Sequence, residues 1–180
     1  MWKKVLLTMG LAVLIAAPVN AQSVSLGPQV GYYRVPDADK GELMFGAAWR
    51  FKFTPMFGLE ASINYRQEKY ADGALTVRSW PVMVTGLIYP VPFVYGAIGA
   101  GWYSTTFDYD QNRFLLLNDE TTQEFGWHFG GGVELPVGTK FKLTADIRYV
   151  FLNYDFKEIP GSDDLESNFY VITAGLLFGL

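Results

Sequence analysis

Hydrolytic chemistry in this chain would depend on its one histidine, because it contains no cysteine. The absence of cysteine excludes a disulfide scaffold, a thiolate zinc site and a cysteine nucleophile. His128 lies between Trp127 and Phe129, and neither residue two positions away is Ser or Thr. A triad needs a nucleophile and an orienting group within hydrogen-bond reach of the base. We therefore expect a structural histidine, with no catalytic residue, no metal site and no cofactor.

Charged residues inside apolar stretches predict a buried network of ion pairs, because buried charges must be paired. Its expected members are Arg50, Glu60, Arg66, His128, Glu134, Asp146 and Arg148. If Phe53 pairs with Phe57 across a tight turn, Arg50 faces Glu60 directly. Two registers stay open for the later hairpin. Glu134 faces either Lys140 or Lys142, and His128 faces either Asp146 or Arg148.

Acidic residues concentrate in four polar stretches, 36–42, 67–73, 108–120 and 155–167. These hold 14 of the 18 acidic residues: Asp37, Asp39, Glu42, Glu68, Asp72, Asp108, Asp110, Asp119, Glu120, Asp155, Glu158, Asp163, Asp164 and Glu166. The plain interpretation is a solvated surface that repels edge-to-edge association. The alternative is contact with divalent cations between lipopolysaccharide phosphates, or with a basic host ligand.

The stretch 108–120 holds the candidate loop-binding residues: Asp108, Asp110, Phe114, Leu115, Leu116 and Leu117. Its acids have the spacing of a calcium loop, but Arg113 stands where the sharp turn needs glycine, which argues against a calcium site. An exposed apolar cluster often marks a binding surface. The alternative is that the neighbouring strands continue beyond a membrane as a hairpin, so that the cluster packs on Tyr109 or on Ile159 and Leu165 of the last loop.

Eight strands are expected to position these residues, because the dominant hydrophobic period after Gln22 is two. Their ranges are 22–35, 43–53, 57–66, 74–89, 93–107, 121–135, 140–154 and 168–180. Tight turns at 54–56, 90–92 and 136–139 alternate with longer loops. Short turns at one end and long loops at the other are typical of bacterial outer-membrane barrels, whose turns lie in the periplasm.

The apolar face of these strands is predicted to face lipid. In 57–66 the odd residues are apolar and the even residues are polar or small, and 140–154 repeats this alternation. A soluble barrel would bury the polar face or expose large aromatic residues to water. Aromatic residues gather near the long-loop end (Tyr32, Phe45, Tyr65, Trp80, Tyr103, Phe125, Trp127, Phe151 and Tyr170) and near the short-turn end (Phe53, Phe57, Phe93, Phe141 and Phe178). They predict two interfacial girdles.

The N-terminus has the pattern of an export signal. Lys3 and Lys4 precede a mostly apolar run from Val5 to Ala17, and Val19 and Ala21 occupy the positions that a signal peptidase reads. We expect cleavage after Ala21, leaving 22–180 as one barrel domain. The formal net charge of −4 disfavours nucleic acid as a partner.

The segments Gly126–Glu134 (GWHFGGGVE) and Leu143–Tyr149 (LTADIRY) resemble the small outer-membrane β-barrel family typified by the OmpA transmembrane domain and OmpX. The resemblance implies an all-β fold, an eight-stranded antiparallel up-and-down transmembrane β-barrel. It also implies an assembly signal in the last strand, met by Thr173, Gly175, Phe178 and Leu180. Expected partners are outer-membrane lipid, lipopolysaccharide and the assembly machinery.

The resemblance to OmpX implies a monomeric, non-enzymatic outer-membrane protein that serves envelope integrity or adhesion through its acidic extracellular loops. An eight-stranded barrel has an interior that side chains can fill, so we expect a polar plug. The alternative function is a narrow channel or transporter for small or hydrophobic solutes.

Overall fold

The computed structural model describes residues 23–34, 41–70, 75–109, 120–152 and 168–180. The predicted export segment 1–21 lies outside these ranges, and so do Asp110 and the apolar cluster from Phe114 to Leu117. Only the backbone of Asp108 is described. In the described part of the chain, no helix is long and apolar enough to cross a membrane.

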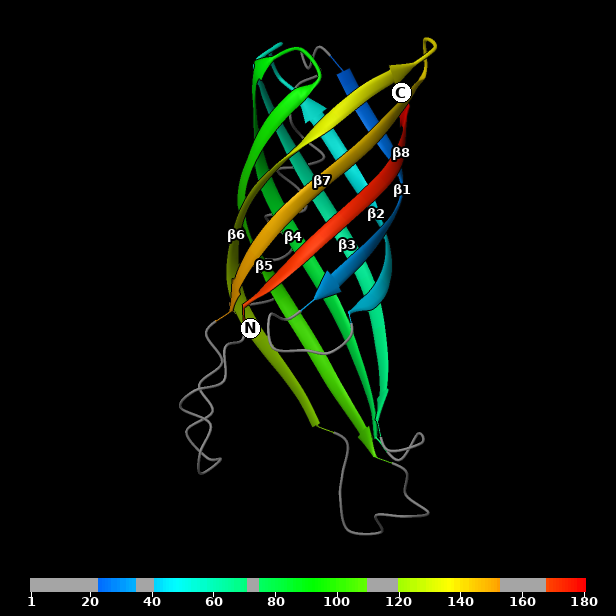
Figure 1. Cartoon of the computed structure of the whole chain (residues 1–180), viewed down its shortest axis with the longest axis vertical. Coiled ribbons are helices and arrows are strands. Elements are labelled where there is room, and N and C mark those ends of the chain that lie inside the picture. Colours follow the sequence, from blue (N-terminus) through cyan, green and yellow to red (C-terminus); the bar gives the residue numbers. More distant parts are fainter. Residues whose placement is uncertain (1–22, 35–40, 71–74, 110–119, 153–167) are drawn as a thin grey trace, which may run out of the picture.

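Eight antiparallel strands form one closed barrel, in which β1 pairs with β8 to complete the wall. The strands are β1 (Ser23–Arg34), β2 (Glu42–Lys52), β3 (Phe57–Tyr70), β4 (Leu75–Val91), β5 (Val94–Tyr109), β6 (Glu120–Val137), β7 (Phe141–Leu152) and β8 (Phe169–Gly179). Figure 1 shows them tilted around a common axis. The predicted eight-stranded antiparallel up-and-down barrel is confirmed. Closure satisfies the strand edges that an open sheet would expose.

The apolar side of the wall faces outward, as the alternation predicts. In β3, Ile63 is 48% exposed while Glu60 is 1% exposed. In β7, Ile147 points outward and Arg148 inward. The barrel is therefore apolar outside and polar at its centre, which is the arrangement of a membrane barrel and the reverse of a soluble one.

Two aromatic girdles surround the outer face. Near the long-loop end the exposed rings, 40–59% accessible, are Tyr32, Phe45, Trp80, Trp102, Phe125, Trp127 and Tyr170. Near the short-turn end they are 40–52% accessible and comprise Phe53, Phe57, Phe141 and Phe178, whereas Phe93, predicted for this girdle, lines the cavity at the mouth of the barrel. Bands of this kind mark the two membrane interfaces of outer-membrane barrels.

Tyr103 is predicted wrongly as a girdle residue. It faces the interior and is 1% exposed, while its neighbour Trp102 faces outward. Between residues 96 and 101 β5 carries small side chains on both faces, apart from Ile98, so its alternation does not reveal the inward side. Pairing with β4 decides it, because Tyr103 lies opposite the buried Pro81.

The β6–β7 hairpin has neither of the two registers left open by the sequence. Glu134 pairs with Thr144, and His128 pairs with Val150. The turn consists of three residues, 138–140. It lies further along the chain than the predicted turn at 136–139, because β6 continues through Pro136. Proline is tolerated at the end of a strand, where few ladder bonds remain to be made. The chain reverses at Gly138, whose φ of 70° is left-handed and suits glycine.

The hairpins β3–β4 and β5–β6 are longer than a membrane requires. Their strands have 14, 17, 16 and 18 residues, whereas 9 to 11 residues span the hydrocarbon core. The predicted loop 67–73 therefore begins too early, because β3 continues to Tyr70. Beyond the girdle the outward side chains become polar: Arg78, Ser104, Thr106, Thr121 and Gln123. These hairpins project past the girdle, at the bottom of Figure 1.

Candidate functional site

An ion-pair network fills the middle of the barrel. Arg50 in β2 and Glu60 in β3 are directly opposed, in the register that the sequence predicts. Both Nε, at 3.0 Å, and Nη2 of Arg50 donate to Glu60 Oε2. Neither side chain is more than 2% exposed. Breaking a pair this deep is costly, because the remaining partner stays buried with an uncompensated charge.

Arg148 in β7 connects this pair to the other side of the barrel. Its Nη2 donates to Glu60 Oε1 at 2.6 Å, and its Nε donates to Asp146 Oδ1 at 3.0 Å. Its Nη1 donates to Thr85 Oγ1 at 3.1 Å. Glu60 therefore accepts from a different arginine at each oxygen, and it links β2, β3 and β7 across the interior.

Glu134 is a second centre of the network, nearer the short-turn end. Its Oε2 accepts from Arg50 Nη1 at 2.8 Å and from the Tyr89 hydroxyl at 2.9 Å. Its Oε1 lies 2.8 Å from Lys52 Nζ and 3.4 Å from Lys142 Nζ. Arg50, Lys52 and Tyr89 thus meet Glu134 across the interior. Lys142 meets it from the neighbouring strand β7, two residues from the ladder partner Thr144.

Four members of the network are missed by the sequence analysis: Lys52, Thr85, Tyr89 and Tyr95. The Tyr95 hydroxyl donates to Asp146 Oδ2 at 2.8 Å, and the Arg50 guanidinium lies 4.6 Å from the centre of its ring. The Lys52 ammonium lies 3.8 Å from the centre of the Tyr89 ring. Parity along β4, where Trp80 faces outward, could have placed Tyr89 inside. Tyr95 is hidden by the same run of small residues that misplaces Tyr103.

His128 is fully buried beside the network. Its Nε2 and Thr85 Oγ1 form a hydrogen bond of 2.9 Å, and the same hydroxyl accepts from Arg148. The other ring nitrogen, Nδ1, has no hydrogen-bond partner. A threonine beside a histidine is one step of a hydrolytic arrangement, but no third group in the described part of the chain orients this base, and neither side chain reaches solvent. The geometry favours the structural interpretation of His128.

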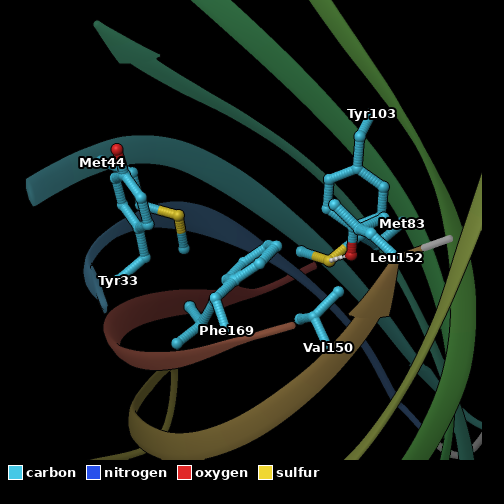
Figure 2. Close-up of a cluster of buried hydrophobic side chains, with 8 residues drawn as sticks. Tyr33, Met44, Met83, Tyr103, Val150, Leu152 and Phe169 are labelled. Carbon is cyan, nitrogen blue, oxygen red and sulfur yellow. Dashed lines mark hydrogen bonds between the residues drawn. The ribbon is translucent and has the colours of Figure 1, made fainter. Parts of the chain in front are cut away.

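Arg66 does not join the network, which corrects its predicted place there. Its guanidinium lies over the rings of Tyr33, at 4.3 Å, and Phe169, at 5.4 Å. These rings belong to an apolar cluster in the long-loop half of the interior: Tyr33, Met44, Met83, Tyr103, Val150, Leu152, Phe169 and Val171. Figure 2 shows the Tyr103 hydroxyl directed at the Met83 sulfur, which it meets at 3.5 Å.

The interior is therefore layered along the barrel axis. The apolar cluster lies in the long-loop half, and the ion-pair network lies in the middle. Nearer the short turns a smaller buried cluster holds Leu87, Tyr89, Tyr95 and Ala97. The arginines of the network are buried in this middle layer, and both form ion pairs with Glu60.

The residues of the predicted assembly signal lie in and just beyond β8. Thr173 points inward and is buried, and Phe178 points outward in the short-turn girdle. Gly175 pairs with Thr144. The backbone N–H of Leu180 donates to the Val24 carbonyl at 3.0 Å, which continues the seam between β8 and β1. Their role in assembly stays a prediction.

Comparisons with known proteins agree with this architecture. The family model of the outer membrane protein beta-barrel domain matches residues 5–178. No curated protein matches the chain. Among solved structures, Ail, the attachment invasion locus protein of Yersinia pestis, is 17% identical with a TM-score of 0.55, over 88% of this chain and 97% of Ail. At this identity the likeness concerns the fold.

Two further solved structures show the same fold. OprG from Pseudomonas aeruginosa is 13% identical with a TM-score of 0.53, over 88% of this chain and 94% of OprG. A major outer membrane protein from Thermus thermophilus is 10% identical with a TM-score of 0.61, over 88% of this chain and 98% of that protein.

Proposed function

Because the chain belongs to the family of outer membrane protein beta-barrel domains, we propose that it is a non-enzymatic envelope protein that acts at the cell surface. Its action is adhesive or structural and is exerted by the long-loop end of the barrel. The interior is a plug that holds the wall in one shape. Solute transport is the competing function, and a conductance measurement separates the two.

The projecting hairpins carry this proposal. A protein that only spans the membrane needs no wall beyond the girdle formed by Trp80, Trp102 and Phe125. Beyond those rings the outward side chains are polar, and Thr106 Oγ1 and Thr121 Oγ1 form a hydrogen bond of 3.0 Å on this face. β3–β4 and β5–β6 therefore form a hydrogen-bonded support that can display the segments they connect.

The acid content of the long-loop end supports a basic ligand. Most of the acidic residues of the chain lie in the stretches that join the strands at that end. Clustered charge of one sign steers an oppositely charged partner and raises its association rate. A basic host ligand fits this composition, and so do divalent cations held between lipopolysaccharide phosphates.

We expect the refolded protein to insert into a planar lipid bilayer without discrete conductance steps. Arg50, Glu60 and Arg148 are buried in the middle of the barrel, and an eight-stranded barrel has an interior just wide enough for side chains to fill. A 16-stranded porin serves as the positive control, and protease protection verifies insertion. Discrete and reproducible steps would refute the plug and favour the transport function.

Neutralising the acids of one loop should weaken the binding of a cationic probe. The variant combines Asp108→Asn, Asp110→Asn, Asp119→Asn and Glu120→Gln, and the probe is a fluorescent octalysine titrated onto phosphatidylcholine proteoliposomes. Loss of four negative charges should together lower the affinity about tenfold.

The matched control for that variant replaces apolar residues in the same stretch, 108–120, and keeps its charge. Phe114→Ser with Leu116→Ser should bind octalysine as the unmodified protein does. If the variant without these four acidic residues bound octalysine as tightly as the unmodified protein does, an electrostatic binding role for this stretch would be excluded.

A further inference from the structure

A cavity of about 490 Å³ lies at the short-turn end of the barrel. Its rim comes from the turns at residues 55–56 and 90–93 and from Pro136 near the end of β6, and its polar floor includes Lys52, Glu134 and Lys142. These turns gather at the end opposite the projecting hairpins, the top of Figure 1. In barrels of this class that end faces the periplasm. The volume lies within the range of small-molecule sites.

The floor of the cavity carries an excess of positive charge. Lys52 and Lys142 share a single carboxylate oxygen, Oε1 of Glu134. The other oxygen of Glu134 is occupied by Arg50 and Tyr89. Across the described ion pairs, four cations (Arg50, Lys52, Lys142 and Arg148) meet three carboxylates (Glu60, Glu134 and Asp146). The arginines are matched deeper in the barrel, so the unmatched cation lies at the cavity.

All three polar contacts of the Lys142 ammonium are long. Its ammonium lies 3.4 Å from Glu134 Oε1, and its hydrogen bonds to Ser23 Oγ and Ser25 Oγ measure 3.4 and 3.3 Å. A well-formed bond between an ammonium and a carboxylate measures about 2.7 to 2.9 Å. Lys142 is 21% exposed, so an anion in the cavity can reach it.

The rim of the cavity is apolar and held in place. Met56, Val91 and Phe93 are each at least half exposed. Phe93 has a φ of 74°, alone among the described non-glycine residues, and its carbonyl accepts from the Glu134 N–H at 2.7 Å. Residues held in such sparsely populated backbone conformations cluster at binding sites. An apolar rim above a cationic floor matches a ligand with an apolar body and one negative end.

We propose that this cavity binds an organic monocarboxylate with an apolar body. The carboxylate lies between Lys142 and Lys52, and the body packs on Met56 and Phe93. The single positive charge at the cavity that lacks a carboxylate partner matches the single negative charge of a monocarboxylate. The site is independent of the surface role proposed above, because it lies at the opposite end of the barrel and involves none of the long loops.

The test is isothermal titration calorimetry of 3-phenylpropionate with the full barrel in phosphatidylcholine nanodiscs. Two reference ligands separate the parts of the site: 3-phenylpropanol has the same body without the charge, and inorganic phosphate has charge without the body. We expect 3-phenylpropionate to bind at least about tenfold more tightly than either, as one charge-assisted hydrogen bond provides.

Paired lysine variants locate the site. Lys142→Gln should weaken 3-phenylpropionate binding about tenfold, whereas Lys140→Gln, two residues away and outside the cavity, should leave it unchanged. Met56→Ser, which keeps every ion pair, should weaken binding about threefold through lost apolar contact. Circular dichroism checks that each variant is folded. If Lys142→Gln does not fold, the result for Met56→Ser alone tests the location of the site.

Three results would overturn the proposal. They are equal binding of the acid and the alcohol, tighter binding of inorganic phosphate than of the acid, and unchanged binding of the acid in both Lys142→Gln and Met56→Ser.

Discussion

Replacing Glu60 with alanine should lower the free energy of unfolding of the barrel by about 3 to 5 kcal/mol. The carboxylate accepts from Arg50 at one oxygen and from Arg148 at the other, and its removal leaves both guanidinium groups buried with one partner fewer. The measurement is the urea unfolding transition in lipid vesicles, followed by tryptophan fluorescence.

The matched control is Glu124→Ala, which removes an acid from β6 outside the network and should change the stability by no more than about 0.5 kcal/mol. Glu60→Gln keeps the shape of the side chain and one acceptor, so it should fall between the unmodified protein and Glu60→Ala. A cycle of Glu60→Ala and Arg148→Ala should give a coupling energy of about 1 to 3 kcal/mol. Unchanged urea midpoints for both Glu60→Ala and Arg50→Ala would show that this ion pair does not contribute to the stability of the barrel.

Replacing Ala145 with arginine should destabilise the barrel by about 2 to 4 kcal/mol, the cost of a cation on the lipid face near the bilayer midplane. Ala145 points outward in β7, between Phe141 and Phe151 on the same face of the strand. Its partners across the ladder are Val133 and Ala174, which give the guanidinium no counter-charge. The same unfolding assay in phosphatidylcholine vesicles measures the loss.

Two controls separate membrane burial from a general intolerance of large side chains. Ala145→Leu should cost little, because lipid accepts an apolar side chain. Thr139→Arg, in the exposed turn between β6 and β7, should cost about 0 to 1 kcal/mol, as at an interface. A soluble barrel would tolerate the arginine at Ala145 as well. Equal stability of Ala145→Arg and the unmodified protein would therefore reject the membrane-facing assignment.

The strand count, the outward apolar face and the Arg50–Glu60 pair could all be predicted from the sequence. Each depends on local information. Strict alternation in β3 and β7 contrasts polar with apolar residues, and the short turn after Phe53 fixes the register of β2 against β3. A side chain that alternates with period two has only two faces to choose from.

Where a strand does not alternate polar with apolar residues, or where the position of a turn is ambiguous, only the tertiary structure determines the inward face and the register. β5 has small residues on both faces, so Tyr95 and Tyr103 are placed by pairing with β4. The β6–β7 register depends on Gly138, whose left-handed conformation moves the turn beyond Pro136, where the sequence predicts that the strand has already ended.

The composition of the plug is also a property of the closed barrel. Arg50 and Glu134 are 84 residues apart and lie on strands that do not pair, yet Nη1 and Oε2 meet at 2.8 Å. Tilt and stagger of the strands set the depth of each inward side chain, and no local pattern carries that information. For the same reason Arg66, which has the correct inward parity, lies over Tyr33 and Phe169 at another depth. Sequence alone determined which residues face inward on most strands, and closure decided which of them meet.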